Sequence, residues 1–545
     1  MFIKITKTGK YEYVQLVRTY RQDGKVKQEV VLNLGRMEEV INNPSLARIG
    51  QRLIELSTGK KPKPFLPDMV SEAELVNWGY LVYRSIWEQF GLDKLLMSLK
   101  ESKKIRFDLE KACFLMAVQH LLDPKSKLGT YLNQSRYFGL QDVSLNHLYR
   151  SLDVLCDNKE KLEAYIFQKN RHLFNMQVDV VFYDVTTFSF ESVKKDSLRD
   201  FGFSKEGKFN EVQVVMGLLV DIEGRPIGYE LFPGNTFEGK TLEAALDKLS
   251  ARFGIRKVIV VADRGINSRM NLKAIADRGY DYIVAFRIKT ATKNIQEEIL
   301  NLEGYVEIPS SSEEELRYKV IKRTNRFKEK GEVFALEETL IATYSSKRAK
   351  KDRKDRERLV EKALLLASSQ SRIRASNKKG GKKYIKEADD ARAQWVVDHE
   401  AIERDALFDG YYAIQTNNQN LSVDQVLEAY HSLWKIEESF RIMKTTLEVQ
   451  PVFHWTERRI KGHFVMCFLA FLMGRTLELT LKKSNHPLSP NDIRQALNSL
   501  NFSRVTMDGH EYLINHRSCE AAKKILRVFR IKNQPNIQSA GDFSI

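Results

Sequence analysis

Cysteine is scarce in this chain of 545 residues, and long hydrophobic runs are missing from it. The cysteines form no close pairs, so the sequence indicates neither a disulfide framework nor a cysteine zinc site. They are Cys113, Cys156, Cys467 and Cys519. The longest apolar run, residues 464–473, is too short to span a bilayer, and the first residues enter a strand pattern without a signal peptide. We therefore expect a cytoplasmic, nucleoid-associated protein with no membrane partner.

Acidic residues are too few to balance the basic ones. The chain has 71 Asp and Glu against 88 Lys and Arg, a net charge of +17 with a pI near 9.4. Such a surplus points to nucleic acid, although charge alone leaves open a soluble protein with a basic surface. Residues 347–386 carry 16 Lys and Arg against 4 Asp and Glu, which is +12 of the total. This concentration favours DNA contact over a solvated charge run, and the candidate contacts are Lys378, Lys379, Lys382 and Lys383.

The pattern of residue types changes several times along the chain. Residues 1–37 predict a small β-meander with a hairpin turn at Asp23-Gly24, and residues 38–175 predict a helical domain. That domain either is DNA-end-binding or has a plain structural role, because no distinctive helix-turn-helix turn stands out in it. From residue 178 the order is three strands, helix, strand, helix, strand. The tight turn at Glu223-Gly224 makes an antiparallel pair and the later strands have helical crossovers, so the sheet is mixed. We expect an α/β catalytic core in two parts, 176–290 and 405–480, interrupted by a basic, partly β insertion at 291–404. Residues 481–545 predict a C-terminal helical region.

Two aspartates lie in or beside apolar strands of this core. Asp184 lies within residues 178–188, and Asp263 ends the apolar strand at 257–262. A carboxylate in a buried strand is costly unless it meets a cation. Two carboxylates on neighbouring strands repel each other and raise at least one pKa, unless a divalent cation lies between them. The alternatives are that Asp263 caps the helix beginning near Asn267 and that Asp184 begins a turn.

A long helix predicted over residues 423–449 offers a third acid. Tyr430, Glu437 and Lys444 are seven residues apart, nearly two helical turns, so they form one stripe. A glutamate in such a position is commonly just a solvated residue. A stripe of Tyr, Glu and Lys that faces a sheet edge with two aspartates instead favours a catalytic site.

These residues resemble a known family, the bacterial insertion-sequence transposases of the Asp-Asp-Glu class. The resemblance is to the branch marked by Tyr-x2-Arg-x3-Glu-x6-Lys, the insertion-sequence-four superfamily. Tyr430, Glu437 and Lys444 match that motif, whereas Leu433 stands at the arginine position. Asp263-Arg-Gly265 and residues 234–236, 434–441 and 451–455 are also similar to this family. The resemblance covers about residues 178–475 and implies a ribonuclease-H-like fold for the mixed-sheet core.

The resemblance also implies an activity. Asp184, Asp263 and Glu437 would hold two Mg²⁺ ions about 4 Å apart, or Mn²⁺ in their place, for hydrolysis at transposon ends and strand transfer into target DNA. A hairpin intermediate at the excised end and a dimer in the synaptic complex are implied as well. Alternatives are a ribonuclease-H-like nuclease without strand transfer and a non-catalytic DNA-binding repressor derived from a transposase.

Further DNA contacts follow from the same resemblance. Tyr430, Lys444 and Arg441 would contact phosphates near the scissile bond, with Arg441 or Lys435 a substitute for the arginine missing at Leu433. In related enzymes a tryptophan from the insertion stacks on a flipped base, and Trp395 is the candidate here. Its alternative role is to pack the insertion against the core.

Overall fold

The structure is a computed structural model that describes residues 1–41, 43–59, 69–174, 179–202, 210–255, 258–308, 314–329, 332–367, 380–387, 395–507 and 510–543. The chain divides into two compact units, one of residues 1–71 with 505–511 and the other of residues 72–504 with 512–545. Lys378 and Lys379 lie outside the described residues.

The smaller unit is built on an antiparallel meander of three strands, β1 (Phe2–Thr8), β2 (Tyr11–Gln22) and β3 (Lys25–Arg36). The hairpin between β2 and β3 turns at Asp23 and Gly24, whose φ angles are 50° and 75°. Positive φ at both central residues is what a two-residue hairpin turn of this kind requires, so the predicted turn is confirmed. Helices α1 (Met37–Val40) and α2 (Pro44–Thr58) follow, with the Asn43 side chain capping α2.

The larger unit contains a nine-stranded sheet in the order β10-β11-β12-β15-β9-β8-β5-β6-β7. Strands β5 (Val180–Ser189), β6 (Gln213–Asp221) and β7 (Pro226–Pro233) are antiparallel, whereas β8 (Ile259–Ala262) and β9 (Asp281–Phe286) run parallel to β5. Helix α9 (Leu242–Phe253) connects β7 to β8, and α10 (Arg269–Asp277) connects β8 to β9. The predicted element order and the mixed sheet are both confirmed.

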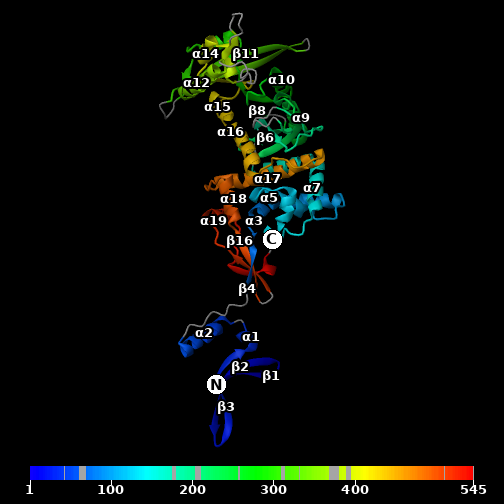
Figure 1. Cartoon of the computed structure of the whole chain (residues 1–545), viewed down its shortest axis with the longest axis vertical. Helices are drawn as coiled ribbons and strands as arrows, with labels where there is room; N and C mark the ends of the chain where they lie inside the picture. The colour runs from blue at the N-terminus through cyan, green and yellow to red at the C-terminus, as the bar shows by residue number, and fades with distance from the viewer. Residues whose placement is uncertain are drawn as a thin grey trace. The chain divides into compact units, whose positions relative to one another are not determined.

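Helices cover both faces of this sheet (Figure 1). One hydrophobic cluster joins alternate residues of β5, β8 and β9 to α9 and α10. The other joins the remaining alternate residues to α15 (Val423–His431), α16 (Trp434–Arg441) and α17 (Glu457–Lys483). The period of two along the strands therefore decides which helices each side chain meets.

The predicted continuous helix over residues 423–449 is wrong in detail. Ser432 and Leu433 separate α15 from α16, where the amides of Leu433 and Ile436 bond to carbonyls three residues back instead of four. Beyond α16 the chain widens into a π-helical turn, η5 (Ile442–Thr446). Tyr430, Glu437 and Lys444 therefore lie on three segments that follow one another instead of on one regular helix.

Helix α17 is the central helix of the larger unit. It is long and apolar enough to pass as a membrane span, but 83% of its most apolar window is buried inside the protein. It packs against α3 (Leu81–Gln89), α5 (Leu109–Leu122), α7 (Leu145–Asp157) and β7. Burial on all sides explains its lack of a polar face.

The remaining helices of the N-terminal half are α4 (Leu92–Ser102), α6 (Lys127–Leu132) and α8 (Lys159–Phe174). The C-terminal region, predicted as helical, contains α18 (Pro490–Asn498) and α19 (Glu520–Val528) together with strands β16 (Asn501–Met507), β17 (His510–Asn515) and β18 (Ile537–Ser539). Those strands belong to a sheet that also includes β4 (Met69–Asn77), far away in sequence. Strands that pair across such a long sequence separation leave no local sequence pattern that predicts the pairing.

The insertion extends the central sheet. Strands β10 (Val306–Glu307), β11 (Leu316–Glu329) and β12 (Glu332–Ser345) join it through β15 (Tyr411–Thr416), which pairs with β9. Helices α11 (Lys293–Leu300), α12 (Ser346–Ala367) and α14 (His399–Ala406) accompany them, with a short hairpin of β13 (Ile385–Glu387) and β14 (Trp395–Val397). The insertion thus forms one continuous sheet with the core.

Candidate active site

Strands β5 and β8 bring two of the predicted acids to matching positions. The parallel pairs end at Phe182 and Val261, and each aspartate lies two residues beyond this last pair, Asp184 within β5 and Asp263 just after the end of β8. Neighbouring strands lie about 4.8 Å apart, so this pairing brings two acids that are far apart in sequence to the same end of two adjacent strands.

Asp184 lies on the face of the sheet that packs against α15, α16 and α17. It alternates with Val185 and shares its face with Phe182 and Phe188, which belong to the hydrophobic cluster beneath these helices. The period of two therefore directs the Asp184 side chain toward the helices that include α16. Asp263 follows the last residue of β8 directly, two residues after Val261 of the same cluster.

Glu437 is carried by that helix. α16 buries Ile436 and Phe440 and packs against β5 and β6, leaving Glu437 exposed next to the packed stripe. Asp263 is exposed and Asp184 half-buried. The structure thus brings the elements that carry all three acids together at a surface that solvent and a large substrate can reach.

The local alternatives for the aspartates fail. The Ser268 side chain, which accepts a hydrogen bond from the Asn271 amide, caps α10, so Asp263 is not its N-cap. Asp184 is the fifth of ten residues in β5, so it does not begin a turn. Helix capping and turn initiation therefore do not explain the two aspartates as the sequence had suggested.

Tyr430 lies in a cavity of about 530 Å³ that it shares with Asp263. Burial raises the pKa of the Tyr430 hydroxyl to about 12, with the negative charge of Asp263 acting in the same direction and Arg348 and Arg264 opposing it. The hydroxyl is therefore protonated at neutral pH and can donate a hydrogen bond. Tyr412, on β15, lines the same cavity.

Lys444 lies on the face of β5 that carries Asp184. Its Nζ is 5.5 Å from the centroid of the Phe188 ring, four residues along the strand from Asp184. Arg441 is 71% exposed and lies 3.5 Å from Glu438 in an ion pair. Leu433, at the motif's arginine position, is buried in the hydrophobic cluster. Lys435 donates to the Ile222 carbonyl at 2.6 Å, so its amine is directed to the end of β6.

The other predicted DNA contacts lie in the insertion. Trp395 is half-buried on β14, where it pairs in register with Glu387. Lys383 forms an ion pair with Asp405, and Lys382 is half-buried in the same short 3-10 turn, Gly381–Tyr384. Trp395 does not line the cavity that contains Asp263 and Tyr430.

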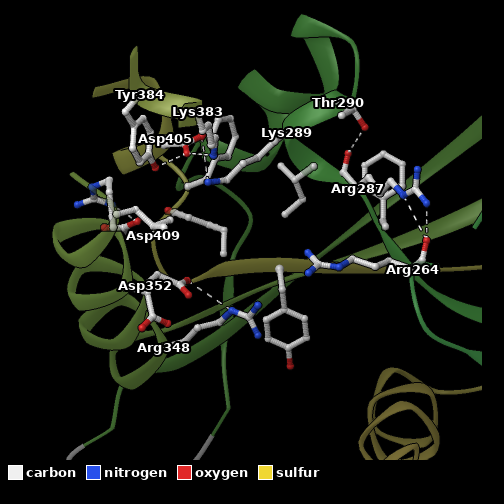
Figure 2. A pocket seen from close by; sticks show the side chains of 18 of the residues that line it. Arg264, Arg287, Lys289, Thr290, Arg348, Asp352, Lys383, Tyr384, Asp405 and Asp409 are labelled. Atoms are coloured by element: carbon white, nitrogen blue, oxygen red, sulfur yellow. Dashed lines mark hydrogen bonds and ion pairs between the residues drawn. The ribbon is translucent and has the colours of Figure 1, made fainter. Parts of the chain in front are cut away.

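A second cavity of about 820 Å³ opens between the core and the insertion (Figure 2). Aromatic side chains line it together with charged ones, and its far wall is held by ion pairs of Asp405 with Lys289 at 3.1 Å and with Lys383. It shares Arg264, Phe286, Arg348 and Tyr412 with the cavity that contains Asp263. Sequence reasoning missed Arg348, because nothing in the basic run 347–386 distinguishes it from its neighbours. Arg264 belongs to the Asp263-Arg-Gly265 segment that resembles the family, but the resemblance assigned it no role.

A buried polar cluster lies behind η5. Ligand atoms of His120, His463 and Cys467 are within 4.8 Å of one another, as in a metal site. However, the Lys127 amine lies 3.2 Å from His120 Nε2, so a cation of the chain itself occupies this cluster. Burial lowers the pKa of His120 to about 3. The neutral rings of His120 and His463 bond to the carbonyls of residues 447 and 449, at 2.9 and 3.2 Å, and so anchor the segment that follows Lys444.

Two segments of the chain match known protein families. Residues 177–473, more than half of the chain, match the family described as the transposase DDE domain. Residues 3–62 match the N-terminal domain of IS1634 family transposases. A comparison with curated protein sequences finds no match.

Solved structures of transposases are distantly similar. The chain matches the piggyBac transposase in a synaptic complex with hairpin DNA at 9% identity and a TM-score of 0.37, over 77% of this chain and 79% of that one. It matches the Mos1 transposase in a paired-end complex with the left transposon end at 14% identity and a TM-score of 0.15, over 32% of this chain and 58% of that one.

Proposed function

This chain belongs to the DDE transposase family, and we propose that it catalyses cut-and-paste transposition by metal-dependent hydrolysis at transposon ends and strand transfer into target DNA. The observation that supports the proposal is the parallel pairing of β5 with β8, which brings Asp184 and Asp263 to the same end of two adjacent strands, together with the packing of α16, the helix of Glu437, against β5. The order β7-β6-β5-β8-β9, antiparallel and then parallel, supports a ribonuclease-H-like core.

The three carboxylates suit a divalent metal, because carboxylate oxygens are the hard ligands that Mg²⁺ prefers. We assign Asp184, Asp263 and Glu437 as the residues that would hold it. A metal held there would supply Lewis-acid chemistry for the attacking water or 3′-hydroxyl and for the leaving oxygen. Without a counterion, two ionised aspartates at the same end of adjacent strands would repel each other.

The neighbouring side chains position DNA. Tyr430, protonated at neutral pH, donates a hydrogen bond to a phosphate oxygen beside Asp263. Lys444 adds a positive charge on the face of β5 that carries Asp184. Both act on the backbone, so they position the scissile bond without reading sequence. Two ends must be held together for transposition, so we propose a dimer when DNA is bound.

The test uses Glu437→Gln, with Glu428→Gln on α15 as the matched control. Glu428 is exposed and lines neither cavity, and the control removes the same charge one helix earlier. We expect Glu437→Gln to abolish Mg²⁺-dependent cleavage of end-bearing DNA while its binding persists, and Glu428→Gln to cleave normally. Full cleavage by Glu437→Gln would refute the assignment.

A second assay separates transposition from simple nuclease activity. Pre-cleaved ends with free 3′-hydroxyls are incubated with a supercoiled target plasmid and Mg²⁺. A transposase joins them to the plasmid, whereas a ribonuclease-H-like nuclease without strand transfer leaves them free. Products that depend on Glu437 and on the 3′-hydroxyl support the proposal.

A further inference from the structure

Two arginines from different parts of the chain meet beside Asp263. Arg264 follows Asp263 directly after β8, and Arg348 lies in the first turn of α12 in the insertion. Both line the cavity of Asp263 and Tyr430, and both line the larger cavity. Figure 2 shows their side chains pointing into the same space, one from the core and one from the insertion.

The arginine side chains are available to a ligand. Among the described residues, the Arg264 guanidinium makes neither a hydrogen bond nor an ion pair, whereas the Arg264 carbonyl accepts from the Arg287 side chain at 2.6 Å and from the Asn267 amide at 3.3 Å. Arg348 lies 3.5 Å from Asp352 in an ion pair whose side chains are 49% and 32% exposed. Exposed pairs of this kind contribute little, so a phosphate can replace Asp352. The Arg348 guanidinium lies 4.9 Å from the centroid of the Tyr412 ring, which restrains its plane.

The segment from Tyr430 to Lys444 has no arginine at the motif position. Leu433 is 8% exposed and packed in the core, and Arg441 is paired with Glu438 and lines neither cavity. A DNA strand reaching Asp263 would instead enter a space bordered by two guanidinium groups. A guanidinium has the planar fork of donors that matches two phosphate oxygens.

We propose that Arg264 and Arg348 form a phosphodiester-binding site beside Asp263, which takes the place of the arginine missing at Leu433. The inference rests on the proposed function for the identity of the ligand, a DNA phosphate. One phosphate held from both sides also joins the insertion to the core, so the insertion positions DNA at the carboxylates through Arg348.

The test compares Arg264→Gln and Arg348→Gln with the control Arg358→Gln. Arg358 lies on α12 as well, is 76% exposed and lines neither cavity, so its loss removes the same charge away from the proposed site. Binding of end-bearing DNA is measured in EDTA, where no cleavage occurs. In each DNA one phosphate near the cleavage site is replaced by a neutral methylphosphonate.

We expect one methylphosphonate position to weaken binding by wild type about 10- to 100-fold, the range for losing a charged hydrogen bond. The same methylphosphonate should weaken DNA binding by Arg348→Gln and Arg264→Gln much less, while binding by Arg358→Gln should be weakened as much as binding by wild type. Arg348→Lys, which keeps the charge without the fork, should recover part of the loss. Circular dichroism checks that each variant folds.

Equal sensitivity of wild type, Arg264→Gln and Arg348→Gln at every phosphate would overturn the inference. This outcome is separate from failure of the proposed function, since binding in EDTA does not depend on cleavage. If Glu437→Gln abolishes cleavage and the arginine variants bind as the control does, the transposase function stands and the phosphate site does not. If wild type binds and never cleaves, the proposed function fails while the phosphate site is still tested.

Discussion

Replacing Lys127 by methionine should stabilise the protein near neutral pH. The side chain is 3% exposed, and its amine lies 3.2 Å from His120 Nε2 in the polar cluster behind η5. Burial lowers the pKa of Lys127 from its ordinary 10.5 to about 8, an effect that the neighbouring Cys467 partly opposes. Burial lowers the pKa values of the imidazoles of His120, His454 and His463 and raises the pKa of the Cys467 thiol to about 12, so at neutral pH all four groups are uncharged and none balances the lysine charge.

The sign and size of the effect follow from that pKa. Folding disfavours the charged form, so the unfolded chain binds more protons between pH 8 and 10.5 and stability rises with pH in that window. At pH 7 the buried charge costs about 3 kcal/mol, since each pKa unit corresponds to about 1.4 kcal/mol. Methionine removes this cost but leaves His120 Nε2 without its partner, at about 1 kcal/mol. We expect a net gain of about 2 kcal/mol at pH 7 that falls to near zero at pH 10.

The assay is urea unfolding of wild type and Lys127→Met side by side at pH 7 and pH 10. Tryptophan fluorescence reports on this part of the protein, because Trp87 is buried against Phe114 of α5. Comparing the two proteins cancels the other lysines, and Lys161→Met at an exposed position on α8 is the control. A stability difference that does not change between pH 7 and pH 10 would refute the reasoning.

Three further predictions concern an ion pair and the insertion. Arg475 is 4% exposed and pairs with Glu438 at 3.1 Å and with Glu478 at 2.8 Å. Arg475→Met would leave these carboxylates without their partner, so it should lower the free energy of unfolding by about 3–5 kcal/mol. Adding Glu438→Gln removes one of the unpaired charges and should restore part of that loss. Changing the four lysines at 378, 379, 382 and 383 to glutamine should reduce the salt dependence of DNA binding by about 0.9 in slope per lost phosphate contact, and an unchanged slope would make them solvated charges. Trp395→Ala should impair processing of the transposon end more than nonspecific binding, whereas equal losses would indicate packing.

Local patterns predicted much of the core because they depend on near neighbours. The run of β-branched and aromatic residues around Asp184 predicts a strand, and the structure has β5 there. The turns at Asp23-Gly24 and Glu223-Gly224 require residues that accept positive φ, and Gly24 and Gly224 adopt it. The sequence did not predict the helix break at Leu433, because the helical spacing of apolar residues continues through it.

The sequence by itself determined that Asp184 lies within one apolar strand, that Asp263 directly follows another, and that Glu437 lies on a helix with Tyr430 before it and Lys444 after it. Their residue types and short-range spacing carry that information. Only the tertiary structure decided that β5 and β8 pair in parallel, so that Asp184 and Asp263 come to the same end of adjacent strands. It also decided that Arg348, alone among the described cations of its basic run, lines the cavity of Asp263. Register and cross-domain contact arise from packing between segments far apart in the chain, and no local pattern encodes them.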